Sequence, residues 1–363
     1  MSALKLYVDT NAIKYNLEQI QKKVGKDVLV MPVIKAKAYG AGFETITEHI
    51  KNFPFIGVTD VSEADKIKEI APDANVFILY QPSLQDIPQI INKNLTIAVS
   101  EIDFLVSLNK AAETKIDVHV SLDTGLGVSG VRKDDLSKFC QIVGSLENIW
   151  VKGAFTQLST HESLEESDMA YTQTQVDEFK QAVEILGQTF GVLLKHINCS
   201  VAILTRPQDN LDMVRIGALV HGIYPQGGRF KDLIDLKPVM RLASIITSIR
   251  KLKKGSALGY GRSVILERDS IVATVNAGYS NGIAKVFGRN GGHVVVNKQC
   301  APVIGNLCMN ITTIDITDIK GKISIGDEVQ IFDNDIIKLE QTSNWCNKGW
   351  NEFLTGLAGV QRI

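Results

Sequence analysis

Short apolar segments alternate with amphipathic ones along the first two-thirds of the chain. The apolar segments are continuous rather than alternating, which is typical of parallel strands covered on both faces. Between most of them, apolar residues recur at helical spacing, which indicates helices. The pattern predicts eight strands, which fall at residues 28–36, 55–60, 75–81, 96–100, 116–123, 151–159, 193–200 and 213–222.

Strands that alternate with helices in this way favour an α/β fold. We predict a (β/α)8 barrel of the TIM type over residues 12–230, followed by a mainly-β C-terminal domain. A doubly wound open sheet is the alternative, because the pattern alone does not show whether the sheet closes into a ring.

The pattern changes after about residue 235. Runs rich in β-branched residues follow one another between Gly, Asn and Asp turns, and no long helical pattern returns before the last residues. The first residues also alternate like a strand and can pair with this region, since chain ends often lie close together. We therefore expect a β-strand domain built from residues 1–11 and 231–363.

Composition narrows the class of protein. The 363 residues are 45% hydrophobic and 22% charged, which is enough for two cores, and the formal net charge of −1 gives no attraction to nucleic acid or an anionic membrane. No signal pattern and no apolar run of about 20 residues is present, so we expect a cytoplasmic protein. Five cysteines without short spacing suggest reduced thiols and no metal site.

The segment VIKAKAYGAG places Lys35 at the end of the first apolar run, before a glycine-containing turn. Active sites of β/α barrels form at the carboxyl ends of the strands, so we expect Lys35 at the barrel mouth. A desolvated amine there is a good nucleophile toward a carbonyl cofactor. A lysine that extends from a strand end into solvent is the structural alternative.

The same segment closely resembles the pyridoxal-phosphate attachment motif of the alanine racemase family, a β/α barrel followed by a C-terminal β domain. The resemblance extends over nearly the whole chain. It implies pyridoxal 5'-phosphate as cofactor, Lys35 as its Schiff-base lysine and Tyr39 as a ligand of its phosphate. It also implies an amino-acid racemase with alanine as the default substrate.

Two later segments resemble the rest of the family's cofactor site. In MVRIGALVHGIYP, Arg215 would donate to the pyridine nitrogen, and because an arginine keeps its proton, the ring would be a weaker electron sink. KHINCSVAI resembles the phosphate-binding strand end. Ser200 would donate its hydroxyl there, together with the backbone N–H groups of Gly217 and Ala218.

Racemisation requires a proton to leave one face of Cα and return on the other, so two bases are needed. The segment SALGYGRSV resembles the one that supplies the family's second base, which implies Tyr260 as the partner of Lys35. In the family this tyrosine enters from the other subunit. The resemblance therefore implies a homodimer with composite sites.

Two further segments resemble the substrate entrance. NAGYSNGI implies Tyr279 as a wall of the entrance, with Asn281 where aspartate is usual. In APVIGNLCMNITTIDIT, the backbone N–H of Met309 would bind the substrate carboxylate, and Asn310 again replaces an aspartate. The entrance should therefore be less acidic than usual.

Further positions depart from the family pattern, among them Lys37 for the usual asparagine and Ala41 for the usual histidine in the attachment motif. Ser121 replaces the usual lysine, and Val128 replaces the arginine that supports the substrate carboxylate. Gln157 stands for a histidine near the cofactor ring, and Asn351 stands for a tyrosine that lines the pocket. Without the ring at position 351, the substrate pocket should be larger.

These departures leave alternatives to an alanine racemase. One is a racemase of broad specificity that acts on serine or on a larger or basic amino acid. Another is a family member that binds the cofactor without turnover. A decarboxylase of the same fold is disfavoured, because such enzymes place a carboxylate and a cysteine where Arg215 and Tyr260 stand here.

Overall fold

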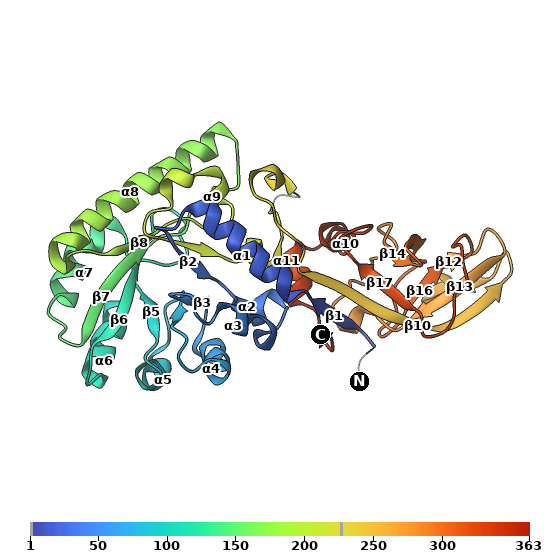
Figure 1. Cartoon of the computed structure of the whole chain (residues 1–363), viewed down its shortest axis with the longest axis horizontal. Helices are drawn as coiled ribbons and strands as arrows, with labels where there is room; N and C mark the ends of the chain where they lie inside the picture. The colour runs from blue at the N-terminus through green and yellow to red at the C-terminus, as the bar shows by residue number, and fades with distance from the viewer. Residues whose placement is uncertain (1–2, 226–227) are drawn as a thin grey trace. The chain divides into compact units, whose positions relative to one another are not determined.

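The structure is a computed structural model that describes residues 3–225 and 228–363. Its chain forms two compact units, which Figure 1 shows in the colours of the sequence. The barrel unit comprises Thr10–Ala38 and Ile46–Lys237. The β unit comprises the residues up to Asp9, the short segment Tyr39–Thr45 and Pro238–Ile363.

The barrel unit holds a ring of parallel strands. Six of them form one sheet in the order β3–β4–β5–β6–β7–β8, and β2 pairs with β9. Bridges between Val33 and Gly57 and between Cys199 and Arg215 join these two sheets on both sides. The predicted barrel is thus confirmed, and the open sheet is wrong. The strands are β2 Leu29–Pro32, β3 Ile56–Val58, β4 Val76–Ile78, β5 Thr96–Val99, β6 Ile116–Ser121, β7 Ile149–Phe155, β8 Leu194–His196 and β9 Met213–Ile216.

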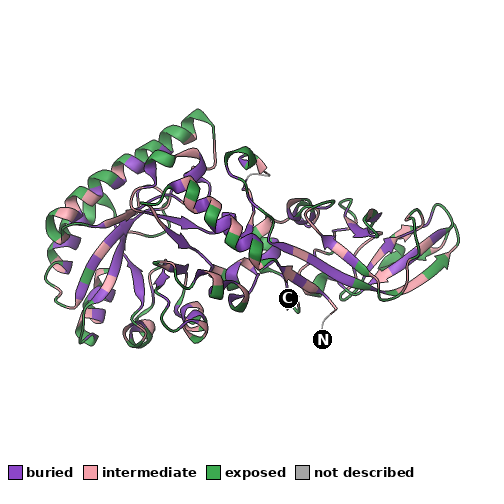
Figure 2. Cartoon of the chain, in the orientation of Figure 1, coloured by how far each residue is buried: buried purple, intermediate pink, exposed green. Residues whose placement is uncertain are grey.

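Helices cover the outside of these strands (Figure 1). In Figure 2 the strands are buried, whereas the helices carry exposed residues on their outer faces. Among the described residues, no helix is both long enough and apolar enough to cross a bilayer. The helices are α1 Thr10–Val24, α3 Phe43–Ile50, α4 Val61–Ile70, α5 Ile87–Asn92, α6 Ile102–Ala111, α7 Leu136–Val143, α8 Glu166–Phe190 and α9 Ala202–Thr205.

The inside of the barrel is filled with apolar side chains. Met31, Phe77, Ala98, Phe155 and Met213 come from five different strands and form one buried cluster. Burial of each large side chain of this kind stabilises the fold by roughly 1.5–3 kcal/mol. Because the interior is packed rather than open, a ligand has to bind at the end of the barrel.

The β unit is built around one sheet in the order β15–β14–β17–β10–β1–β18, and β13 pairs with both β10 and β16. The N-terminal strand β1 runs antiparallel to β10, as its alternating pattern suggests. The strands are β1 Lys5–Val8, β10 Met240–Leu252, β13 Ser270–Val275, β14 His293–Val296, β15 Gln299–Pro302, β16 Thr312–Asp315, β17 Glu328–Phe332 and β18 Gln361–Arg362. A hairpin and two helices complete it: β11 Ala257–Leu258, β12 Val264–Ile265, α10 Leu339–Trp345 and α11 Trp350–Thr355.

The segment Tyr39–Thr45 packs within the β unit although it follows the first barrel strand. The ring of Tyr39 stacks on Trp350 with centroids 5.7 Å apart, and Nε of Arg362 donates to the carbonyl of Gly40 at 2.6 Å. Gly40 has φ +88°, and a Cβ there would lie 2.5 Å from the carbonyl oxygen of Leu354. Only glycine therefore permits this close packing.

Candidate active site

Lys35 begins a left-handed turn directly after the first barrel strand. Ala36, Lys37, Ala38 and Tyr39 all have φ between 52° and 56°, which places four consecutive non-glycine residues in the left-handed region. Each such residue costs about 1–2 kcal/mol relative to the right-handed form. Strain of this kind persists only where surrounding contacts enforce it, and it concentrates at functional sites.

Glu63, on helix α4, supplies such contacts. Its Oε1 accepts the N–H of Ala36 at 2.5 Å, and its Oε2 accepts both the N–H and the hydroxyl of Thr59 at 3.0 Å. The helix itself begins at Asp60, whose side chain accepts the N–H of Glu63. One carboxylate thus ties the residue after Lys35 to the end of the neighbouring strand.

Arg215 lies in β9 and is almost entirely buried. Its Nη1 donates to Nδ1 and to the carbonyl of His196, at 3.0 and 2.8 Å. Its Nη2 donates to the carbonyls of Thr156 and Ile197 and to Oε1 of Gln157, at 2.7, 2.9 and 3.1 Å. Among the described residues, the Nε–H of Arg215 has no acceptor. Burial lowers the pKa of Arg215 to about 10, so the guanidinium stays charged at neutral pH.

Two buried histidines extend this network. Because Arg215 donates to Nδ1 of His196, the proton of His196 sits on Nε2, which lies 2.9 Å from Nδ1 of His119. Burial lowers the pKa of His119 to about 3, and burial together with the charge of Arg215 holds the pKa of His196 well below its usual range. Both rings are therefore neutral, and the positive charge stays on Arg215.

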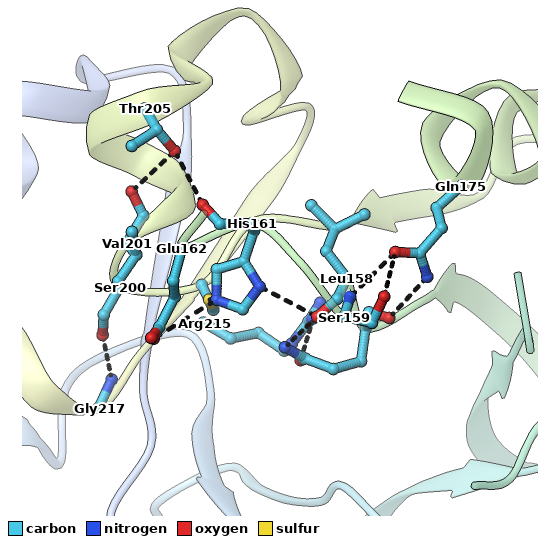
Figure 3. Close-up of polar contacts among 12 residues, drawn as sticks. Leu158, Ser159, His161, Glu162, Gln175, Ser200, Val201, Thr205, Arg215 and Gly217 are labelled. Atoms are coloured by element: carbon cyan, nitrogen blue, oxygen red, sulfur yellow. Dashed lines mark hydrogen bonds and ion pairs between the residues drawn. The ribbon is translucent and has the colours of Figure 1, made fainter. Parts of the chain in front are cut away.

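Gln157, predicted as a substrate-site residue, contacts the arginine instead of standing free. Its side-chain oxygen accepts from Arg215, and its backbone carbonyl accepts from Nε2 of Gln175 at 3.3 Å. Gln175, on helix α8, is fully buried and also receives both the N–H and the hydroxyl of Ser159, as Figure 3 shows. The long outer helix thus fixes the segment that holds Arg215.

Ser200 and Gly217 form a small polar cradle at the strand ends. The hydroxyl oxygen of Ser200 accepts the N–H of Gly217 at 3.1 Å, and the Ser200 side chain is buried (Figure 3). In the described part of the chain, neither the hydroxyl proton of Ser200 nor the N–H of Ala218 finds an acceptor. Unpaired donors at the first residue of a helical turn suit an anion such as phosphate.

In the β unit, Tyr279 and Met309 lie on two loops that bond to each other. The N–H of Tyr279 donates to the carbonyl of Cys308 at 3.1 Å, and the N–H of Ser280 donates to that of Met309 at 2.9 Å. Asn310 adds a side-chain bond to the hydroxyl of Ser280 at 2.9 Å. The two predicted substrate residues are thus brought together, and the N–H of Met309 has no acceptor among the residues described.

Tyr260 starts the short turn between β11 and β12 and is 85% exposed. Gly259 and Gly261 on either side have φ of 70° and 68°, so glycine on both sides lets the backbone turn there. Its hydroxyl has no partner within the described residues. The turn therefore presents the phenol outward rather than packing it into the β unit.

Val128 is 71% exposed in the loop after β6. Asp123 shapes this loop by accepting the N–H groups of Gly125 and Gly127 at 3.0 Å, and the hydroxyl of Tyr171 donates to the carbonyl of Gly125 at 2.8 Å. The exposed valine gives this hydrogen-bonded loop an apolar tip.

Three residues around the site were not predicted from the sequence: Glu63, His119 and His196. A histidine inside an apolar strand pattern signals a buried polar group that needs a partner, but not which partner. Glu63 stands three residues after Asp60, a spacing typical of a helix start. The sequence therefore explains Glu63 by helix capping and does not indicate its hydrogen bond to Ala36.

Comparison with known proteins assigns the chain to a family. A family model described as the alanine racemase N-terminal domain matches residues 8–225, and one described as the C-terminal domain matches residues 239–363. Alanine racemase 2 of Caldanaerobacter subterraneus subsp. tengcongensis is 31% identical over 335 residues, 90% of this chain and 85% of that protein. The alanine racemase of Clostridium kluyveri is 31% identical over 333 residues, 90% of this chain and 83% of that protein.

Solved structures share the fold. Alanine racemase of Clostridium difficile 630 superposes with a TM-score of 0.92 at 24% identity, covering 99% of this chain and 94% of that one. The Bartonella henselae alanine racemase, described with covalently bound pyridoxal phosphate, gives a TM-score of 0.88 at 23% identity and covers 100% of this chain and 99% of its own. With the two family models spanning nearly all of the sequence, the chain belongs to the alanine racemase family of pyridoxal phosphate-dependent amino-acid racemases.

Proposed function

We propose that this chain interconverts L- and D-amino acids, with alanine as the first substrate to test. The observation that carries the proposal is Arg215, whose Nη1 and Nη2 atoms make five hydrogen bonds within the barrel unit. A buried guanidinium with one remaining donor is suited to present that donor to a single ligand atom. Membership of the family supports the reaction class.

The donors of the barrel unit fit pyridoxal phosphate. When bound, this cofactor supplies an aldehyde that joins to amines and a ring that withdraws electrons from Cα of the substrate. Ser200, Gly217 and Ala218 would hold its phosphate, and Tyr39 is a further proposed ligand. Arg215 would hold the ring nitrogen with a hydrogen bond, because a guanidinium does not give up its proton at neutral pH.

Lys35 and Tyr260 are the proposed pair of bases. Lys35 would carry the cofactor at rest and then move the proton on one face of Cα, and Tyr260 would move it on the other. Tyr260 is 85% exposed in the single chain, which supports a homodimer in which a second copy covers it. Met309 would bind the substrate carboxylate through its N–H, with Tyr279 beside it at the entrance.

Several amino acids besides alanine are candidate substrates. The exposed Val128 and Asn351 replace a cation and an aromatic ring, and both changes favour a wider range that includes serine or larger and basic amino acids. We place the protein in the cytoplasm, because all five cysteines are free thiols and free thiols persist in a reducing compartment.

One panel tests these proposals together. Purified protein loaded with pyridoxal phosphate is incubated with each standard L-amino acid except achiral glycine, and the enantiomers are separated by chiral chromatography. Formation of D-alanine alone, of D-serine, or of several D-amino acids distinguishes the specificities. A protein that turns yellow with cofactor yet produces no D-amino acid would be a binding member without turnover. Lys35→Ala is the matched control and should produce none.

A further inference from the structure

Cys199 and His161 form a second polar pair next to the cofactor cradle. Sγ of Cys199 lies 3.0 Å from Nε2 of His161. Nδ1 of His161 lies 3.0 Å from the carbonyl oxygen of Leu158, a contact that Figure 3 marks with a dashed line. A carbonyl oxygen can only accept, so Nδ1 of the neutral ring carries the proton. Nε2 is then free to take the proton of the thiol. Sulfur, base and orienting carbonyl together have the geometry of an activated nucleophile.

The surroundings favour the charged pair. Burial raises the pKa of Cys199, but the His161 charge and hydrogen bond, the N–H of Ala202 and the charge of Arg215 outweigh it and bring that pKa to about 7. Burial lowers the pKa of His161, but Cys199 and the carboxylate of Glu162, 3.9 Å away, outweigh it and raise that pKa above its usual value. These are the titratable and charged groups that face the pair.

The other four cysteines provide a contrast within the same chain. Burial raises the pKa of Cys140, and it raises the pKa of Cys346 to about 11. Cys300 is exposed and Cys308 is half-buried. Among the described residues, none of these four has an imidazole as hydrogen-bond partner. In the described part of the chain, Cys199 is therefore the cysteine that has an imidazole base within hydrogen-bond distance.

We propose that the Cys199–His161 pair is a covalent modification site that reacts with small hydroperoxides. The thiolate sulfur attacks one oxygen of hydrogen peroxide, and the O–O bond breaks. The leaving hydroxide takes the proton from the His161 imidazolium and becomes water. Sulfur is oxidised to a sulfenic acid, and the peroxide is reduced to water. Cys199 is half-buried as a residue, so the reaction at its sulfur calls for an oxidant as small as hydrogen peroxide.

The first test measures thiolate formation by absorbance, which does not require a reagent to reach the sulfur of Cys199. The absorbance of thiolate near 240 nm is followed from pH 5.5 to 9.5 in the cofactor-loaded protein and in Cys199→Ser. The difference between the two should titrate with a midpoint near 7. In His161→Asn the midpoint should move toward the ordinary thiol value of about 8.5. An unchanged midpoint in His161→Asn, or a midpoint near 8.5 in the parent protein, overturns the proposal.

Reactivity is tested second, with the other cysteines as internal controls. The loaded protein is treated with hydrogen peroxide at pH 7 and then with dimedone, which labels sulfenic acids, and the peptides are analysed by mass spectrometry. Cys199 should be labelled several-fold faster than the exposed Cys300, and His161→Asn should remove most of that difference. A Cys199 that forms a thiolate but takes up no label contradicts the modification site.

Discussion

The predicted site residues fall into two regions with opposite character. In the barrel unit, Arg215 is buried and held by five hydrogen bonds, and Gln157, His196 and Ser200 are bonded around it. In the β unit, Tyr260 is 85% exposed and its hydroxyl has no partner in the part of the chain that the structure describes.

The contrast shows two ways in which a fold can position a catalytic side chain. The barrel region is preorganised by the chain itself, so its geometry should depend on folding and little on a partner. The phenol of Tyr260 is presented on a turn with no hydrogen-bond partner among the described residues, so its work depends on what comes to cover it. Changes in the first region should therefore affect stability, and changes in the second should affect activity alone.

Arg215→Leu should give the largest effect on stability. It leaves buried acceptors on His196, Thr156 and Ile197 without a donor, which we expect to cost about 3–5 kcal/mol in the free energy of unfolding. Urea unfolding measures it. Lys253→Leu, which removes an exposed ion pair with Asp269, is the control and should cost less than about 1 kcal/mol. An equal loss of unfolding free energy in the two variants would show that the hydrogen bonds of Arg215 do not stabilise the fold.

Tyr260→Phe tests the opposite behaviour. Loss of one of two bases should slow proton exchange at Cα by about 10²–10⁴ in one direction and much less in the other, whereas the free energy of unfolding stays within about 0.5 kcal/mol. Exchange in deuterated solvent, started separately from each enantiomer, measures it. Tyr171→Phe serves as control and should show no directional difference. A symmetric loss in Tyr260→Phe argues against two bases on opposite faces.

Acid should weaken the buried network. The folded pKa of His119 is about 3, against 6.5 for the free side chain, so the unfolded state binds a proton first as the pH falls. Stability should be complete above pH 6.5 and decrease below it by about 1.4 kcal/mol per pH unit for each such histidine. Urea unfolding at several pH values measures the slope, which His119→Asn should reduce. The same slope in that variant would assign the acid sensitivity elsewhere.

Glu63→Gln should give the smallest of these effects. The amide keeps one oxygen as acceptor, so part of the bonding to Ala36 and Thr59 is lost, and we expect a cost of about 1–2 kcal/mol with slower turnover through Lys35. Glu69→Gln is a control on the same helix, because the carboxylate of Glu69 forms an exposed pair with Lys66. If both variants behave alike, Glu63 does not support the left-handed turn.

The sequence predicts the fold well because the strand signal is local. Continuous apolar runs, such as the one that becomes β5, mark strands buried on both faces whatever their partners are. Closure of the ring is not local: it rests on single bridges such as Cys199 with Arg215, which no periodicity indicates. The stacking of Tyr39 on Trp350 cannot be predicted from the sequence pattern either, since those residues are far apart in the chain.

The site divides in the same way. Lys35 and Arg215 are predicted because their motifs are contiguous and resemble those of a known family. His119 with His196, and Cys199 with His161, are pairings between distant segments, and only the folded chain brings them together. Val128 and Gln157 are predicted as substrate-site residues, and the structure shows a bonded partner for Gln157 but an exposed position for Val128.

One measurement bears most directly on the proposal that this chain racemises alanine. L-alanine is incubated in deuterated water with the protein loaded with pyridoxal phosphate. The enantiomers are then separated, and their masses are measured by mass spectrometry. The account predicts D-alanine that carries one deuterium at Cα, in an amount that approaches that of the L form. L-alanine recovered unlabelled and unchanged, from protein that visibly holds the cofactor, would contradict it.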